Sequence, residues 1–283
     1  MTQINKKIVL ITGASSGIGL ATSIYLAKEG YTVYSGALND YEKKELDEKA
    51  IKNNVELKIV QINVNDDDSV KNGITTILNN ENRIDVLINN AGYGLTGFLE
   101  DCSMEEMKKQ FETNFFGPMR LIKETLPIMR EQKSGYIINI SSVFGRISFP
   151  ITSIYNASKA ALSAVTDALR IETAPFGIKV TTIEPLNIKT NFHKKIVLAE
   201  KYKNSDSQYK KYMDFYLNKM SKASHERLSD PIVVAKKIHQ IVNTENPKTR
   251  YTMVKGATMA LIAKSLLPAR FFETMLRKNF FGV

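Results

Sequence analysis

Short apolar segments alternate with amphipathic helical segments along the chain of 283 residues, and this alternation limits the fold more than any other feature. Such alternation is typical of a parallel sheet with helices on both faces. Strands are predicted at 7–12, 31–36, 57–62, 84–89, 135–141, 178–184 and 250–254. Helices are predicted at 17–29, 41–53, 67–80, 104–133, 153–174 and 231–244. We therefore expect an α/β fold with a doubly wound, seven-stranded parallel sheet in a single domain over residues 1–283.

Two stretches interrupt the alternation. Residues 194–222 are polar with scattered aromatic side chains, which predicts a helical lid insertion at about 191–229. The tail at about 256–283 is an apolar, amphipathic extension with interspersed basic residues, namely Lys264, Arg270, Arg277 and Lys278. A basic amphipathic stretch of this kind could lie on a membrane surface. It could also cover a substrate pocket or a neighbouring subunit, which is the interpretation we prefer.

Composition indicates an ordinary soluble protein without nucleic acid as a partner. The formal net charge is +10, but lysines are mixed with acidic residues, as in residues 42–45, and such mixing is typical of solvated helix faces. The N-terminus lacks the apolar core of a signal peptide, and no apolar run is long enough for a membrane span. We therefore expect a cytoplasmic protein. Cys102 is the single cysteine, so no intrachain disulfide can form, and a buried, unreactive thiol is the expected state.

A glycine-rich turn follows the first predicted strand, in the sequence Thr-Gly-Ala-Ser-Ser-Gly-Ile-Gly at residues 12–19. Gly13 permits a sharp exit from the strand, Gly17 lets the backbone approach a pyrophosphate, and Gly19 allows close packing of helix on strand. The N-terminus of the following helix favours an anion. The spacing G-x-x-x-G-x-G differs from the usual dinucleotide pattern G-x-G-x-x-G, so the strand and helix on either side carry much of this prediction.

Tyr155 and Lys159 lie four residues apart in a predicted helix, and Ser142 precedes Tyr155 by thirteen residues. Residues at i and i+4 share a helix face, so the ammonium group would lie near the phenol and lower its pKa from about 10. Ser142 would offer a hydroxyl to a substrate oxygen. Taken alone, a Tyr-x-x-x-Lys pair indicates only two solvated side chains. The other motifs of the chain favour the catalytic interpretation of this pair.

Together these segments resemble the short-chain dehydrogenase/reductase family, which has a Rossmann-type fold. The resemblance rests on residues 12–19, the Asn-Asn-Ala-Gly run at 89–92, Asn114, Ser142, Tyr155 and Lys159, in the order and spacing of the family. It covers residues 6–185 strongly and the rest more loosely. Residues 93–94 and 111–117, together with the tail, resemble the branch that includes 17β-hydroxysteroid and retinol dehydrogenases.

The resemblance implies a role for each matching residue. Tyr155 would be the general acid in reduction and the base in oxidation, Ser142 would bind the substrate oxygen, and Lys159 would lower the pKa of Tyr155 and hold the nicotinamide ribose. Asn114 would hold a water molecule linking Lys159 to solvent; the alternative is a polar residue bonded to its own helix. The implied cofactor contacts are Gly13, Ser15, Ser16, Gly17, Ile18, Gly19, Leu38, Asn63, Val64, Asn90, Ala91, Gly92, Tyr155, Lys159, Pro185, Ile188 and Thr190, and no metal is expected.

The chain departs from the family pattern at two places. Asn63 stands where Asp is common, and Leu186 follows Pro185 where Gly is usual. The end of the second strand, Ala37 and Leu38, has neither the carboxylate that selects NAD nor an arginine for a phosphate. With Lys43 and Lys44 nearby, we expect NADP as the cofactor, and NAD stays possible.

An apolar pocket is expected above the nicotinamide, with Tyr93, Ser142, Phe144, Phe149, Leu186 and Phe192 as substrate contacts. It would suit an apolar secondary alcohol or ketone, or an alcohol and aldehyde pair, of steroid-, retinoid- or lipid-like character. The expected activity is hydride transfer with a Tyr-Lys-Ser proton relay, in a homodimer or homotetramer. The alternative is a non-catalytic nucleotide-sensing protein on the same fold, which would be expected to lack the Tyr-Lys pair.

Overall fold

All seven predicted strands form one parallel sheet. The computed structural model describes residues 6–190, 196–223, 228–253 and 255–281. The strands are β1 (Ile8–Ile11), β2 (Thr32–Ala37), β3 (Lys58–Gln61), β4 (Val86–Asn89), β6 (Gly135–Ile140), β7 (Ile178–Glu184) and β9 (Arg250–Thr252). Their order in space is β3-β2-β1-β4-β6-β7-β9. The chain reverses its direction of winding between β1 and β4, and in such sheets ligands bind beyond the strand ends at this point.

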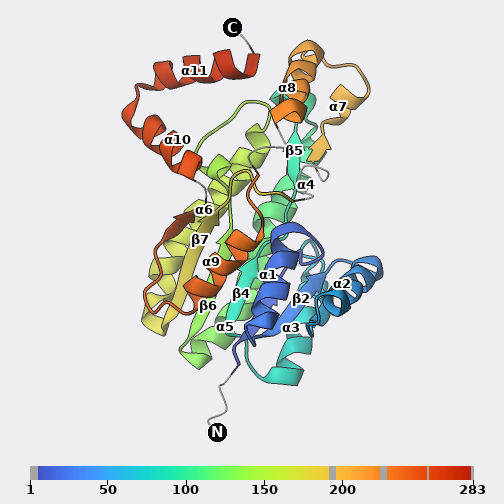
Figure 1. Cartoon of the computed structure of the whole chain (residues 1–283), viewed down its shortest axis with the longest axis vertical. Helices are drawn as coiled ribbons and strands as arrows, with labels where there is room; N and C mark the ends of the chain where they lie inside the picture. Colours follow the sequence, from blue (N-terminus) through green and yellow to red (C-terminus); the bar gives the residue numbers. More distant parts are fainter. Residues whose placement is uncertain (1–5, 191–195, 224–227, 254, 282–283) are drawn as a thin grey trace.

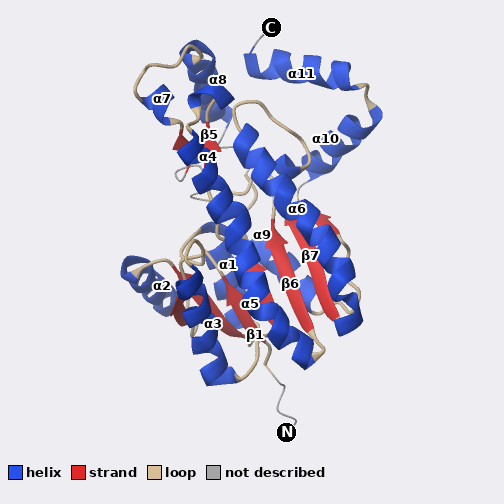
Figure 2. Cartoon of the chain, turned by 180° about the vertical axis from the view of Figure 1, so that it is seen from behind, coloured by secondary structure: helices blue, strands red, loops and turns tan. Residues whose placement is uncertain are grey.

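Each face of the sheet is covered by its own layer of helices, as Figures 1 and 2 show from opposite sides. One layer contains α1 (Gly17–Lys28), α2 (Asp40–Lys52) and α9 (Ile232–Val242); the other contains α3 (Asp67–Glu81), α5 (Gly117–Gln132) and α6 (Ser153–Thr173). Along β1, Ile8 and Leu10 belong to one hydrophobic core, whereas Val9 and Ile11 belong to the other. This period of two is the strand geometry, and it explains why the strand is apolar throughout.

The predicted helix over 104–133 is wrong in one respect, because the structure divides it. It consists of α4 (Met104–Phe111), a π-helical turn (Glu112–Phe116) and α5. Pro118 has no N–H group, so it cannot donate the ordinary hydrogen bond to the carbonyl of residue 114. Single π turns inside α-helices occur frequently at functional sites, and this one contains the buried Asn114.

The segments outside the alternation lie above the carboxyl ends of the strands (Figure 1). The lid insertion contains β8 (Ile196–Leu198), α7 (Glu200–Lys203) and α8 (Lys210–Ala223), and β8 pairs with β5 (Gly94–Thr96) in a small parallel sheet that the sequence did not predict. The tail forms α10 (Lys255–Leu266) and α11 (Ala269–Phe281). Among the helices described, none is long and apolar enough to cross a membrane.

Candidate active site

Hydrogen bonds join the glycine turn to the residues after β4, across the switch point of the sheet. Thr12 Oγ1 accepts hydrogen bonds from the N–H groups of Asn90 and Ala91, both at 3.1 Å. The Asn90 amide donates to the carbonyls of Thr12 and Gly13 at 2.9 and 3.1 Å. The two segments that the sequence assigns to the cofactor therefore form one rigid unit.

The backbone geometry of the turn and its close neighbours require glycine at three positions. Gly13 has φ +62° and Gly17 has φ +58°, the left-handed region that glycine adopts readily. A Cβ on Gly19 would lie 2.2 Å from the Gly13 carbonyl oxygen, so this position tolerates no side chain. Ser16 makes no side-chain cap, which leaves the first N–H groups of α1 available to an anion. Thr190 lies beside Gly17, as its predicted phosphate contact requires. These residues fit a dinucleotide.

Ser142, Tyr155 and Lys159 are brought together at the ends of β6 and α6. The side chains of Ser142 and Tyr155 are hydrogen-bonded. Lys159 Nζ lies 6.0 Å from the centroid of the Tyr155 ring and donates to the Ile140 carbonyl at 2.9 Å. Tyr155 is 9% exposed and Lys159 is 5% exposed. The alternative of a solvated pair is therefore wrong, because a free pair of this kind would not be buried.

Burial controls the protonation of both titratable groups. It raises the pKa of Tyr155 to about 12, and the hydrogen bond from Ser142 acts in the opposite direction. It lowers the pKa of Lys159 from 10.5 to about 8. Burial sets the direction in this structure, so the pKa of Tyr155 is raised and not lowered as the sequence predicts from Lys159. At neutral pH the phenol is a proton donor and the amine is mostly charged.

Asn114 joins this group from the π turn. Its Oδ1 accepts from the N–H of Tyr93 at 3.1 Å, and its Nδ2 donates to the Tyr93 carbonyl at 2.9 Å and to Ser158 Oγ at 3.3 Å. A Cβ on Gly92 would lie 2.9 Å from Asn114 Oδ1 and 3.5 Å from Lys159 Nζ. The alternative of a bond to its own helix is therefore wrong. Its role in holding a water molecule stays a prediction.

Buried polar side chains, to which the sequence analysis gave no structural role, fix α6 against the sheet. Asn89 Nδ2 donates to Asn139 Oδ1, and Asn139 Nδ2 donates to Thr166 Oγ1, each at 2.8 Å. Ser141 Oγ donates to the Lys159 carbonyl at 3.1 Å. Polar residues inside otherwise apolar strands were the available signal, because a buried amide needs partners.

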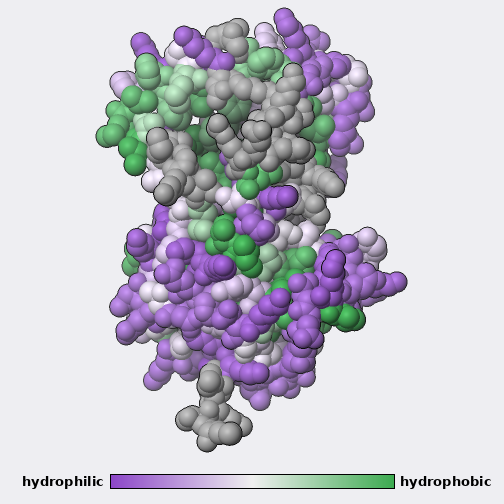
Figure 3. Space-filling model, in the orientation of Figure 1, coloured by the Kyte–Doolittle hydropathy of each residue, from purple (hydrophilic) through white to green (hydrophobic). Residues whose placement is uncertain are grey.

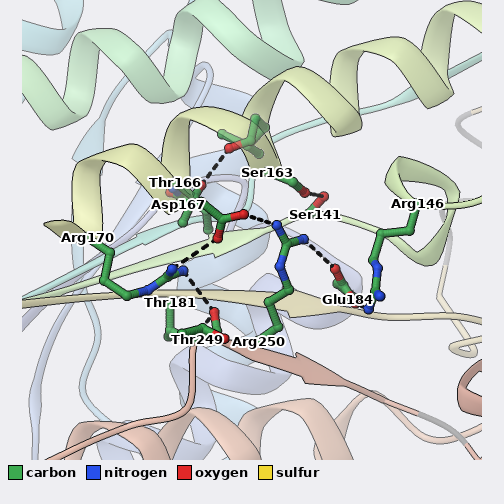
Figure 4. A network of polar contacts seen from close by, with 12 residues as sticks. Ser141, Arg146, Ser163, Thr166, Asp167, Arg170, Thr181, Glu184, Thr249 and Arg250 are labelled. Carbon is green, nitrogen blue, oxygen red and sulfur yellow. Dashed lines mark hydrogen bonds and ion pairs between the residues drawn. The ribbon is translucent and has the colours of Figure 1, made fainter. Parts of the chain in front are cut away.

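A network of charged side chains connects the turn after Ser142 to the far edge of the sheet (Figure 4). Glu184, fully buried at the end of β7, pairs with Arg250 of β9 at 3.0 Å and with Arg146 at 3.4 Å. Arg250 also pairs with Asp167 of α6, which in turn accepts from Arg170 at 3.0 Å. The helix that carries Tyr155 is therefore joined to β9 by an ion pair, and through Arg250 to Glu184 of β7, as well as by apolar packing.

The structure brings a carboxylate to the adenosine end of the cleft, although the sequence places none there. Glu42, in the first turn of α2, accepts a hydrogen bond from the N–H of Leu38 at 2.9 Å. Lys43 pairs with Asp40 at 3.0 Å. The N–H of Asn63 donates to Ser69 Oγ at 2.9 Å, and Val64 is buried. The argument for NADP from a missing carboxylate is weakened, because Glu42 supplies one from the helix.

The expected pocket residues gather above Tyr155. The Phe144 ring lies 6.0 Å from the Tyr155 ring and 4.5 Å from the Phe149 ring, centroid to centroid. Leu186 packs with Phe149 on a cluster that includes the buried Phe272 of α11. Tyr93 is partly buried beside Asn114, and Phe192 lies outside the described residues.

The remaining predicted contacts lie along the same rim. Pro185 follows β7, and its carbonyl accepts from the N–H of Val143 at 3.4 Å. Ile188 is buried and bridges to Ser229. Phe272 of the tail is buried against Val143 and Ile147 on the pocket side of the molecule, and the preference for a covering role over a membrane contact stays a prediction. Among the described residues, no group of His, Cys, Asp and Glu side chains could hold a metal ion.

A doubly wound sheet with a glycine turn at its switch point and a buried Ser-Tyr-Lys set defines a dinucleotide-dependent oxidoreductase. The family model for short chain dehydrogenases matches residues 7–201, and the chain belongs to this family of enzymes, which act on CH–OH groups. The chain is 34% identical to a 3-ketodihydrosphingosine reductase of Bacteroides thetaiotaomicron over 275 residues, covering 96% of this chain and 97% of the relative. It is 34% identical to retinol dehydrogenase 8 of Bos taurus, covering 93% and 86%. The predicted family and branch are confirmed.

Solved structures agree with this assignment. A short-chain dehydrogenase from Streptomyces avermitilis superposes with a TM-score of 0.83 at 30% identity, over 100% of this chain and 99% of the other. ElxO with NADP bound superposes with a TM-score of 0.73 at 27% identity, over 90% and 99%. The predicted seven-stranded Rossmann-type fold is confirmed.

Proposed function

We propose that this enzyme is an NADP(H)-dependent reductase of ketones on apolar, lipid-like molecules. The observation that carries the proposal is the buried set of Ser142, Tyr155 and Lys159, in which Tyr155 holds its proton at neutral pH. Neutral phenol is the form that donates a proton to a carbonyl oxygen, which supports a role for Tyr155 in reduction. ElxO, a structural relative, binds NADP, which supports this cofactor over NAD.

Each residue has a separate task in the proposed reaction. The Ser142 hydroxyl donates a hydrogen bond to the substrate oxygen and fixes the carbonyl near Tyr155. The Tyr155 phenol then gives its proton to that oxygen, and the charged Lys159 stabilises the phenolate that remains. When bound, the dinucleotide supplies the hydride for the carbonyl carbon. Asn114, hydrogen-bonded to the backbone of Tyr93 and to Ser158, would hold the water molecule through which a replacement proton passes from solvent to Lys159.

The apolar surroundings of Tyr155 support the substrate class. Phe144 and Phe149 lie directly beside it, and Leu186 joins the cluster under α11. Two relatives are named as a 3-ketodihydrosphingosine reductase and a retinol dehydrogenase, and these names support an extended, lipid-like ketone or alcohol as the substrate. A steroid would be bulkier and more rigid, so we favour the extended kind.

Replacing Tyr155 with phenylalanine tests the mechanism. Turnover with NADPH and apolar ketones is expected to fall by at least about 10²-fold, because the proton donor is lost. Binding of NADPH, followed by its fluorescence, should persist. Ser163→Ala, which removes a buried hydroxyl from the same helix outside the set, is the control. Undiminished turnover would refute the assignment. If the wild type binds NADPH but reduces no carbonyl compound, the nucleotide-sensing alternative is favoured.

We also propose two kinds of contact with other molecules. The exposed face of α6 presents Ala164, Ala168 and Ile171 on successive turns, which supports close packing of two copies as a homodimer. The outer side of α10 and α11 exposes Leu266 and Phe271, and the corner of these helices is hydrophobic in Figure 3, which supports peripheral contact with a bilayer. Light scattering and sedimentation with anionic vesicles test the two proposals.

A further inference from the structure

A short helical turn, Val143–Gly145, follows Ser142 directly, and its backbone sets the direction of the Ser142 hydroxyl. Ser142 Oγ accepts a hydrogen bond from the N–H of Phe144 at 3.1 Å. A hydroxyl has one proton, and accepting from Phe144 leaves this proton free to be donated. Ser142 is also bonded to Tyr155, and this bond opposes the rise of the Tyr155 pKa. The position of the Phe144 N–H therefore decides whether the Ser142 proton points to the catalytic phenol.

The turn lies between α6 and the end of β7. A Cβ on Gly145 would lie 2.9 Å from the carbonyl carbon and oxygen of Lys159, so the turn and α6 are in direct contact there. At the end of the turn, the Arg146 side chain pairs with Glu184 of β7 at 3.4 Å. Lys264 of α10 donates to the Arg146 carbonyl. Arg146 thus connects the end of the turn both to the sheet and to the tail.

Glu184 is fully buried, and three side chains donate to its two carboxylate oxygens. Its Oε1 accepts from Arg250 at 3.0 Å, and its Oε2 accepts from Thr252 Oγ1 at 2.9 Å and from Arg146 at 3.4 Å. Figure 4 shows Arg250 and Arg146 on either side of this carboxylate. A buried carboxylate is held firmly when its oxygens are bonded in this way. Glu184 is therefore a fixed point to which the turn is attached.

The charges of this network balance without Arg146. Asp167 pairs with both Arg250 and Arg170, so two carboxylates face two arginines when Arg146 is left out. The Arg146 side chain is 42% exposed, and ion pairs at such exposure contribute little to stability. The contact between Arg146 and Glu184 therefore matters for where the turn lies more than for the charge of Glu184.

We propose that Arg146, held by Glu184, is a positioning residue that directs the Ser142 hydroxyl at the substrate oxygen. The proposal rests on the proposed function and extends it. The contacts run from Glu184 through Arg146 to the Phe144 N–H, and from there to Ser142. Loss of the Arg146 contact shifts the turn, whereas the glycine turn on the far side of the sheet keeps its own hydrogen bonds. Reduction of the substrate should then suffer, and binding of NADPH should not.

Arg146→Met removes the ion pair and keeps most of the side-chain stem. With NADPH and methyl octyl ketone, kcat should fall by about tenfold, because a small displacement of a hydrogen-bond donor is costly to catalysis. The KM for NADPH should stay within about twofold of the wild-type value. Arg146→Lys should keep kcat within about threefold of wild type, since the contact with Glu184 uses a single nitrogen and needs no guanidinium fork.

Arg170→Met is the matched control at the other end of the network. Arg170 donates to the carbonyls of Val180 and Thr249 and pairs with Asp167. Its loss should lower the melting temperature at least as much as R146M does, while kcat stays within about twofold of wild type. If R146M and R170M lose kcat in proportion to their melting temperatures, Arg146 is merely structural and the proposal is overturned.

A double-mutant cycle with Ser142→Ala tests whether Arg146 acts through Ser142. In the S142A background, R146M should change kcat by less than about twofold, because the hydroxyl that Arg146 positions is gone. If the two losses multiply instead, Arg146 acts on some other part of the site and the proposal fails.

A tryptophan reporter follows the turn without any substrate. The sequence contains no tryptophan, so Phe144→Trp places a single indole in the turn beside Tyr155. R146M should move its emission to longer wavelength and increase its quenching by acrylamide, whereas R170M should do neither. This response without reduction of any ketone would sink the proposed function and leave the positioning of the turn standing. Reduction of methyl octyl ketone by the wild type, with unchanged emission and kcat in R146M, would do the reverse.

Discussion

Replacing Lys159 with methionine exchanges a buried ammonium group for an apolar chain of similar length. Burial lowers the pKa of Lys159 from 10.5 to about 8, so the folded state binds this proton more weakly than the unfolded state does. At about 1.4 kcal/mol per pKa unit, the charge costs the folded state roughly 3 kcal/mol at neutral pH. The exchange also removes the donor to the Ile140 carbonyl, which costs about 1–3 kcal/mol. The variant should therefore equal or exceed the wild type in stability by up to about 2 kcal/mol.

The pH dependence of this difference is a sharper prediction than its size. A basic group with a lowered folded-state pKa destabilises the fold fully below that pKa, and the penalty disappears as pH rises through the unfolded-state value. For Lys159 the relevant window runs from about 8 to 10.5. The free energy of unfolding of the wild type should thus rise by about 2 kcal/mol relative to the variant between pH 7 and about pH 9.5.

Urea unfolding followed by circular dichroism at the two pH values measures this difference. Tyr155→Phe is the matched control, because the pKa of Tyr155 is about 12 and the phenol stays neutral at both pH values. Both variants should lose turnover, but only the change at Lys159 should alter the pH dependence of stability. A stability difference between wild type and K159M that is the same at both pH values would refute the idea that the buried site destabilises the ammonium.

Three further predictions concern the rest of the molecule. Glu42→Gln should raise the preference for NADP over NAD by about fivefold. The change removes a negative charge near the expected ribose phosphate, and this repulsion is worth about 1 kcal/mol. The ratio of kcat/KM values with the two cofactors measures the preference. Gly19→Ala should abolish NADPH binding in a fluorescence titration, since the added Cβ would lie 2.2 Å from the Gly13 carbonyl oxygen; wild-type affinity would contradict the described turn. Cys102 should resist iodoacetamide in the folded protein at pH 8 and react after unfolding, because burial raises its pKa to about 11, and mass spectrometry follows the label.

The sheet was predictable from the sequence because its strands are buried on both faces. Such strands are apolar at every position and stand out between polar helices, and all seven were found. The π turn at 112–116 was not predictable from periodicity, since α4, the π turn and α5 follow one another without a break in the helix. Pro118 was the visible sign, and its effect on residue 114 depends on hydrogen bonding that a hydrophobic pattern does not encode.

The catalytic residues were found through their spacing, whereas their electrostatics depend on burial. The sequence predicts a lysine that lowers the Tyr155 pKa, because charge is the visible property of a side chain. Desolvation, which raises this pKa to about 12, comes from residues distant in the chain that close over the site. Glu42 was missed for a similar reason: its carboxylate reaches the end of β2 from the next helix, so its place follows from the loop geometry.

The packing of α11 against the segment after Ser142 has a consequence for how the protein folds during its synthesis. Ribosomes add residues from the N-terminus, so the residues of the glycine turn, Ser142, Tyr155 and Lys159 are joined well before residues 269–281. Until α11 arrives, the apolar surface around Phe144 and Phe149 lacks the contacts with Phe280 and Leu276 that cover it. During synthesis this apolar surface is open to chaperones and to other nascent chains until α11 covers it.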